Sequence, residues 1–179
     1  MTKFIRIVLL ISLGAIISHI FILFSIPYYA QSSIWEHLKK SANYHQFAYL
    51  DPSDPIYQSS DPLFIIKVCR FNLANGPVHL RAMETTRLWS LSAYTSNGII
   101  FYSVNDRTAP DATLNLVIGK PIQIIELKKS KPKNSTNSVL VAKDLNEGFA
   151  ILRAFSPSPI TEKESEIFLS SATCRVFNE

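Results

Sequence analysis

The stretch WSLSAYTSNGIIFYSV, residues 89–104, gives the clearest indication of the fold class. In its first half Trp89, Leu91 and Ala93 alternate with polar residues, the pattern of a strand with one buried face and one solvated face. Asn97-Gly98 then provides the positive φ angles that a tight hairpin needs. We therefore expect two antiparallel strands joined at this turn.

Similar short segments, bounded by turn residues, lie on both sides of this hairpin. A second Asn-Gly pair, Asn75-Gly76, predicts a tight hairpin between the strands expected at residues 64–71 and 78–82. About eight short strands in one chain are typical of a β-sandwich or jelly-roll-like domain, so we expect a mainly β fold. The further strands are predicted over residues 64–71, 78–82, 114–118, 122–127, 139–143 and 149–155.

The amino-terminal part of the chain is of a different kind. Residues 7–26 form an uncharged apolar run, with Lys3 and Arg6 just ahead of it. About 20 helical residues cover roughly 30 Å, the thickness of the hydrocarbon core of a membrane. The alternative is a cleaved secretory signal, whose apolar core usually has only about 7–15 residues. We therefore expect residues 7–26 to contact membrane lipid as a transmembrane helix, an uncleaved signal anchor.

The basic residues near the ends of this run predict its orientation. Lys3 and Arg6 lie on the short amino-terminal side, which we place in the cytoplasm. The domain then lies outside, in the periplasm of a bacterial inner-membrane protein. An aromatic belt at the outer interface is predicted for Tyr28, Tyr29 and Trp35.

A short juxtamembrane helix is expected after the anchor. Ser33 and Glu36 form a capping-box pattern, and apolar residues then recur at helical spacing up to about Asn43. Three Asp-Pro pairs within residues 51–62 predict an irregular connector, because proline lacks a donor and restricts the residue before it. The predicted regions are a cytoplasmic tail and anchor (1–30), a juxtamembrane helix and Pro-rich connector (31–62) and a β-rich domain (63–179).

A carboxy-terminal helix should complete the β-rich domain. Thr161 and Glu164 repeat the capping-box spacing, so the helix is expected to start there and run towards Ala172. Ile167 and Phe168 should provide its apolar contact with the sheet.

Two cysteines, Cys69 and Cys174, are present. An even number in an exported domain favours a structural disulfide, while two buried free thiols or a reactive cysteine are the alternatives. Neither cysteine has a His or Cys at metal-ligand spacing, so no metal site is predicted.

The charge of the chain does not indicate a nucleic-acid partner. The net charge is +4, and without Lys3 and Arg6 the remaining 16 basic and 14 acidic residues give only +2. The basic cluster Lys128, Lys129, Lys131 and Lys133 lies in a polar stretch that fits a surface loop, with contact to anionic lipid headgroups as the alternative.

The most concentrated polar cluster follows the predicted hairpin. Asn105, Asp106 and Arg107 are the predicted ligand- or partner-binding residues, since they lie at the end of a strand. Ordinary turn chemistry is the alternative interpretation. The chain has no glycine-rich phosphate loop and no nucleophile elbow, so neither a cofactor nor a catalytic residue is predicted.

The segments around the hairpin resemble a bacterial family of envelope proteins that carries a domain of unknown function. Its strand reads R-Y/F-W-S-L-x-x-Y-D, and its hairpin reads N-x-F-S-x-N-D-R-T. This chain departs from the pattern at Leu88, where an aromatic residue is common, and at Thr95, where an acid is usual. The matching segments are Arg87–Tyr94, Asn97-Gly98, Phe101–Ser103, Asn105–Thr108, Cys69–Phe71 and Ala172–Cys174.

The resemblance covers nearly the whole chain and implies the short, membrane-anchored branch of that family. In larger relatives the domain precedes a second domain of unknown function on one polypeptide. The resemblance therefore implies that a separate companion membrane protein carries that second domain here.

Taken together, the sequence predicts a non-enzymatic, single-pass membrane protein whose outward β domain binds a partner or serves as a structural component of the cell envelope. A small-ligand or lipid-binding module is the first alternative. A non-catalytic subunit of an envelope enzyme is the second.

Overall fold

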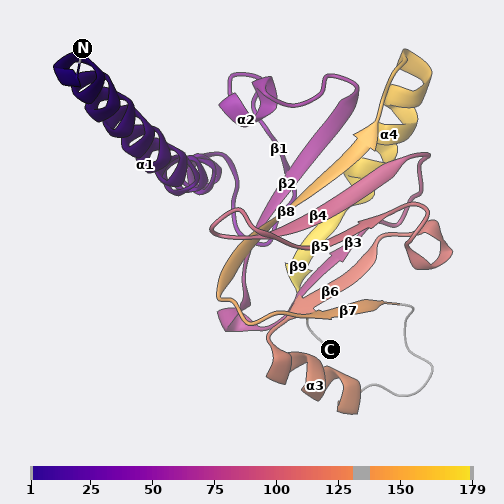
Figure 1. Ribbon diagram of the computed structural model, residues 1–179. Coiled ribbons are helices and arrows are strands. Elements are labelled where there is room, and N and C mark those ends of the chain that lie inside the picture. The colour runs from indigo at the N-terminus through magenta and orange to yellow at the C-terminus, as the bar shows by residue number, and fades with distance from the viewer. Residues whose placement is uncertain (1, 131–137, 178–179) are drawn as a thin grey trace.

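The computed structural model describes residues 2–130 and 138–177, and it consists of one long helix joined to a two-sheet domain (Figure 1). The long helix is α1 (Thr2–Ser41). The shorter helices are α2 (Pro55–Gln58), α3 (Pro121–Ser130) and α4 (Pro159–Ser171), with 3-10 turns at Leu73–Asn75 and Pro110–Ala112. Of the basic cluster predicted in a surface loop, Lys128 and Lys129 lie instead in the last turn of α3, and Lys131 and Lys133 lie outside the described residues.

The strands form two sheets, which confirms the prediction of a mainly β, sandwich-like domain. The five-stranded sheet is antiparallel throughout, whereas in the four-stranded sheet β6 and β7 are parallel. In spatial order the first sheet contains β1 (Ala48–Tyr49), β2 (Phe64–Asn72), β8 (Glu147–Phe155), β4 (Trp89–Thr95) and β5 (Ile100–Asn105). The second contains β7 (Val139–Ala142), β6 (Asn115–Gly119), β3 (Val78–Arg81) and β9 (Thr173–Val176).

The main core lies between the two sheets. The alternating residues of the predicted hairpin, Trp89, Leu91 and Ala93, are all buried there, and Gly98 takes the expected positive φ of 78° between β4 and β5. From the opposite sheet, alternating residues of β3 and β6 are buried against them. These are Val78, Leu80, Leu116 and Ile118.

Strand β2 is buried on both faces. Cys69 and Phe71 point into the main core, whereas Ile66 and Val68 belong to a second apolar cluster on the outer face of the five-stranded sheet. The last turns of α1 cover this outer face through Trp35 and other apolar side chains. A strand with two buried faces explains why residues 64–71 read as an almost continuous apolar run.

The predicted juxtamembrane helix is the last part of α1, which is continuous from Thr2 to Ser41 and does not begin anew at Ser33. Both parts of α1 favour a continuous helix. The amino-terminal apolar run is helical, and in the last turns Trp35 and Leu38 need helical spacing to reach the sheet. Trp35 is only 7 % exposed, with its ring 6.1 Å from that of Phe149. The prediction that Trp35 belongs to an interfacial belt is therefore wrong.

Residues 122–127 form most of helix α3, so the strand predicted there is wrong. Pro121 occupies the first helical position, where its missing N–H costs nothing. Ile124 and Leu127, three residues apart, are buried against β6, while Ile122 and Ile125 are exposed. A run rich in β-branched residues resembles a strand locally, but its burial follows the helical period.

The predicted hairpin at Asn75-Gly76 is also wrong, because β2 and β3 belong to different sheets. The side chain of Asn72 accepts a hydrogen bond from the Ala74 N–H and starts a 3-10 turn. Gly76 then adopts a φ of 128°, which a residue with a side chain rarely takes. The Asn-Gly pair thus turns the chain from one sheet to the other.

The carboxy-terminal helix α4 is present, but it starts earlier than predicted. Its capping box is formed by Ser158 and Thr161 rather than by Thr161 and Glu164, and Pro159 takes the first helical position. Of the two residues expected to contact the sheet, Phe168 is fully buried and Ile167 is 49 % exposed.

Candidate functional site

The cysteines form a disulfide bond between the two sheets. Cys69 lies in β2 and Cys174 in β9, and both residues are buried. This confirms the predicted bridge and suits an oxidising compartment.

The predicted site residues Asn105, Asp106 and Arg107 lie at a turn that begins with the last residue of β5. The Asn105 side chain accepts hydrogen bonds from the backbone N–H groups of Arg107 and Thr108, at 3.1 and 3.0 Å. Arg107 is exposed, and within the described residues its side chain makes no hydrogen bond or ion pair. The structure thus gives Asn105 a turn-forming role, while ligand binding by Asp106 and Arg107 stays a prediction.

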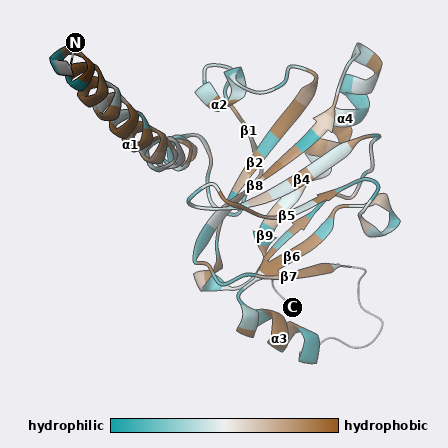
Figure 2. Cartoon of the chain, in the orientation of Figure 1, coloured by the Kyte–Doolittle hydropathy of each residue, from teal (hydrophilic) through white to brown (hydrophobic). Residues whose placement is uncertain are grey.

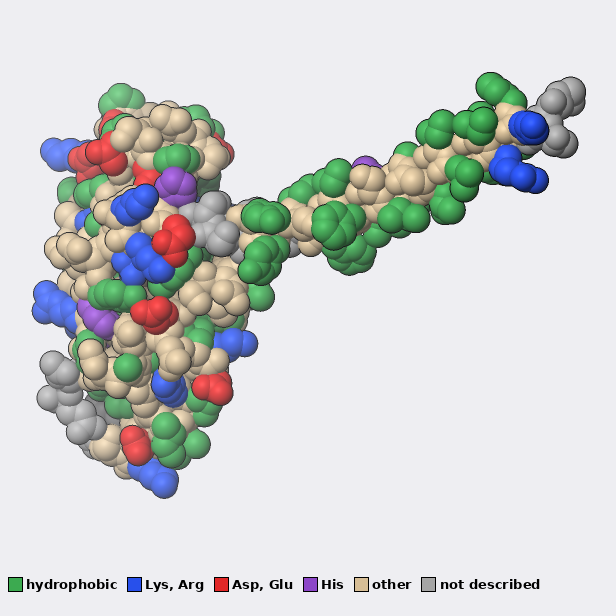
Figure 3. Space-filling view, turned by 90° about the vertical axis from the view of Figure 1, so that its left-hand side faces the viewer, with side chains coloured by type: hydrophobic (Ala, Val, Ile, Leu, Met, Phe, Trp, Pro, Cys, Tyr) green, Lys and Arg blue, Asp and Glu red, His purple; other side chains and the backbone are tan. Residues whose placement is uncertain are grey.

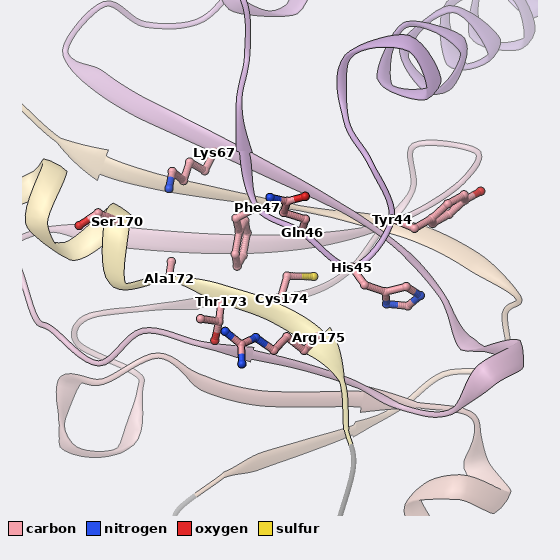
Figure 4. Close-up of a pocket in the computed structure, with 10 residues that line it drawn as sticks. All are labelled: Tyr44, His45, Gln46, Phe47, Lys67, Ser170, Ala172, Thr173, Cys174 and Arg175. Carbon is pink, nitrogen blue, oxygen red and sulfur yellow. The ribbon is translucent and has the colours of Figure 1, made fainter.

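A groove of about 450 Å³ lies where one edge of each sheet comes together. On one side is the segment Tyr44–Phe47, which leads into β1, and on the other side is β9 (Figure 4). We call this the edge groove. It is lined by Tyr44, His45, Gln46, Phe47, Lys67, Ser170, Ala172, Thr173, Cys174 and Arg175.

A second groove, of about 330 Å³, runs along the outer face of the four-stranded sheet. It shares Thr173 and Arg175 with the edge groove, so the two adjoin at β9. We call it the outer groove, and its lining residues are His79, Arg81, Thr173, Arg175, Val176 and Phe177. No Asp or Glu lines either groove within the described residues.

His45 is the most unusual side chain of the edge groove. Its Nδ1 is buried and has no hydrogen-bond partner within the described residues, and its backbone has a φ of 58°. Burial lowers the pKa of the His45 imidazole below its ordinary value, because a buried site disfavours the charged form. A buried polar atom without a partner is able to form a hydrogen bond with a ligand.

The lowered pKa of His45 predicts a loss of stability on acidification. As the pH falls below about 6.5, the unfolded chain binds the proton before the native chain does, so the free energy of unfolding decreases. The decrease ends once the pH is below the native pKa. We expect His45→Asn, which tolerates the positive φ, to remove this part of the pH dependence. Urea unfolding at about pH 7.5 and about pH 5.5 measures the change in the free energy of unfolding between the two pH values. The same change in the unmodified chain and in His45→Asn would contradict the prediction.

Two buried cations on β2 hold the ends of two helices. The Lys67 ammonium donates a hydrogen bond of 2.9 Å to the carbonyl of Leu169 near the end of α4, and burial lowers the pKa of Lys67. On the opposite face, Arg70 donates to the carbonyls of Lys39 and Ala42 at the end of α1. Cations are stabilised at the negative end of a helix dipole, so both side chains have a structural role.

Neither these two residues nor the two grooves were predicted from the sequence. The available signal was a lysine and an arginine inside an apolar strand, since buried charges must find partners. Within residues 2–130 and 138–177, no three His, Cys, Asp or Glu side chains lie together in a way that could hold a metal ion.

Comparison with known proteins places the fold without naming an activity. No protein-family model matches the chain, and no curated protein matches it. Among solved structures, the chain is similar to the VPA0106 protein from Vibrio parahaemolyticus, with a TM-score of 0.60 and 14 % identity over 84 % of this chain. An uncharacterised protein from Burkholderia cenocepacia aligns over 76 % of this chain with a TM-score of 0.47 and 13 % identity. The chain spans only 37 % and 35 % of the lengths of these two proteins.

Proposed function

We propose that this chain is a single-pass inner-membrane protein whose periplasmic β domain binds a companion membrane protein. The observation that carries the proposal is the division of α1 into two parts. Its segment Lys3–Ile26 has a mean hydropathy of 2.7 and is not buried by the domain, whereas its last turns pack on the sheet. Hydrophobic residues surround the first part (Figure 2), and basic side chains lie at its far end (Figure 3).

The proposal of a companion has two supports. The first is the resemblance to envelope proteins in which this domain is followed by a second one. The second is the Vibrio protein, in which a fold like this one makes up about a third of a longer chain. A non-enzymatic role is proposed because the sequence offers no catalytic motif.

Membrane insertion predicts that the chain stays with the membrane in a carbonate wash, because a predominantly apolar helix of 24 residues is long enough to span it. Ile16→Arg with Ile17→Arg should release it, since each arginine at mid-span costs about 2.5–3.5 kcal/mol in insertion. Ile16→Leu with Ile17→Leu is the matched control and should stay. Release of the unmodified chain would contradict the anchor.

The orientation has its own test. Alkaline phosphatase fused to the carboxy terminus should be active, because this enzyme needs an oxidising compartment for its disulfides. A green fluorescent protein fused at the same place and exported in the unfolded state should stay dark. The reverse result would place the domain in the cytoplasm.

Partner binding is tested by chemical crosslinking in intact membranes. We expect an adduct between this chain and a second membrane protein, identified by mass spectrometry. Recovery of the chain only as an uncrosslinked monomer would contradict the proposed function.

A further inference from the structure

Strand β9 leaves one edge of its sheet without a neighbour, because the described strands run in the order β7-β6-β3-β9. The Phe177 N–H donates a 2.7 Å hydrogen bond to the carbonyl of Pro77, which sets the register of the ladder between β3 and β9. In an antiparallel pair the backbone groups of alternate residues point to the partner strand. The N–H and C=O groups of Cys174 and Val176 therefore point away from β3, towards the open edge.

These groups have no hydrogen-bond partner in the described part of the chain. Opposite Cys174, across the edge groove, lies the segment Tyr44–Phe47 at the border of the other sheet (Figure 4), whereas Val176 lines the outer groove. Proteins normally protect a free strand edge by covering it or by placing proline or charge on it. Strand β9 has no proline and carries a single charge, Arg175.

The charged side chains that line the two grooves are all basic, and the carboxylate of Glu147 accepts a hydrogen bond from the Tyr44 hydroxyl without lining either groove. His45 and Lys67 line the edge groove, and His79 and Arg81 line the outer groove. Arg175 lines both grooves, and the side chains of Arg81 and Arg175 make no ion pair within the described residues. Burial, and to a lesser extent the charge of Glu166 in α4, raises the pKa of Tyr49, but Glu166 does not line either groove.

From the free backbone groups of β9 and the side chains of Arg81 and Arg175, which make no ion pair within the described residues, we propose that the open edge of β9 docks an extended, acidic segment of the companion protein. The segment adds to the four-stranded sheet as a further strand. Its backbone pairs with Cys174 and Val176, and its carboxylates meet Arg175 and Arg81. This inference rests on the proposed function, because it assigns the companion a place on the domain.

A peptide of alternating Thr and Glu, labelled with fluorescein, tests the recognition directly. The full chain in detergent micelles is expected to bind it, with a rise in fluorescence anisotropy. Two peptides serve as controls: one has Lys in place of Glu, and the other has methylated backbone nitrogens that cannot donate to a strand. Both are expected to bind at least about tenfold more weakly.

The protein variants address the location. Arg175→Glu and Arg81→Glu should each weaken binding of the Thr-Glu peptide by about tenfold or more, while Lys163→Glu, an exposed charge reversal on α4, should not. Fluorescence of the buried Trp89 verifies that each variant is folded. Unchanged binding by both arginine variants, or no binding by the unmodified chain, would overturn the inference. Equal binding of the methylated peptide, with full competition by inorganic phosphate, would mean a simple anion site and would also overturn it.

Crosslinking in intact membranes separates this inference from the proposed function. If the unmodified chain gives the adduct and Arg81→Glu with Arg175→Glu abolishes it, both stand. If the adduct is unaffected by the two substitutions, the docking surface is wrong and the proposed function remains. If the unmodified chain gives no adduct, the proposed function fails, and the peptide measurements alone decide whether β9 accepts an acidic strand.

Discussion

Replacing Cys69 and Cys174 together with alanine is expected to lower the free energy of unfolding by about 4 kcal/mol. The bridge joins residues 105 positions apart, so without it the unfolded chain gains conformational freedom. It also joins two sheets that share no β-ladder. Trp89, only 1 % exposed in the core, reports the loss by fluorescence during urea unfolding in detergent micelles, with Trp35→Phe as the common background.

Reduction gives an independent control for this prediction. Dithiothreitol added during unfolding of the unmodified chain should reproduce the loss, because it removes the same constraint. The alanine variant should not respond to dithiothreitol. An unchanged urea midpoint in the alanine variant would show that the bridge does not stabilise the domain.

The sequence predicted the elements whose residues show a clear local period. Residues 89–104 alternate because β4 has one face in the core, and their Asn-Gly turn is a true hairpin. Residues 122–127 were misassigned because isoleucines favour strands, while Ile124 and Leu127 follow the helical period. The pair Asn75-Gly76 has the same local chemistry as Asn97-Gly98, but only the three-dimensional arrangement decides which sheet the next strand joins.

The candidate docking surface was beyond sequence reasoning for a different reason. It brings together Tyr44–Phe47 and Thr173–Arg175, segments that are far apart in the chain. The edge of β9 is open only because of the strand order, which a single sequence does not give. The sequence indicated the local cluster Asn105–Arg107 as a site instead, because turns concentrate polar residues. The hydrogen bonds of Asn105 explain its presence there as a turn-forming residue.

Arg70→Met is expected to loosen the end of α1 from the domain by about 1.5–3 kcal/mol, the range for hydrogen bonds that involve a charged group. Arg70 is 5 % exposed, and its Nη1 lies 3.3 and 3.1 Å from the carbonyl oxygens of Lys39 and Ala42. Its guanidinium also lies over the rings of Trp35 and Tyr44, with centroids at 4.9 and 4.1 Å. Methionine keeps the apolar stem but leaves both carbonyls without this donor.

The docking of α1 is measured separately from global unfolding. In a Trp89→Phe background, Trp35 is the remaining tryptophan, and its emission should shift to the red as its ring gains contact with water. Amide hydrogen exchange over Ser41–His45 should speed up in Arg70→Met. In Arg70→Lys, the Trp35 emission and the exchange rate should lie between those of the unmodified chain and of Arg70→Met, because a lysine keeps the charge but lacks the planar guanidinium.

Arg153→Met is the matched control for this prediction. Arg153 lies in β8 on the same face of the sheet and is half-buried, but its side chain makes no hydrogen bond within the described residues. We therefore expect Arg153→Met to leave the Trp35 emission unchanged. Equal effects of the two substitutions would mean that the contacts of Arg70 with the helix end do not fix α1. The anchor and the domain would then be coupled through the apolar packing of Trp35 and Leu38 and the hydrogen bond from Ser41 to Asp54, which both variants retain.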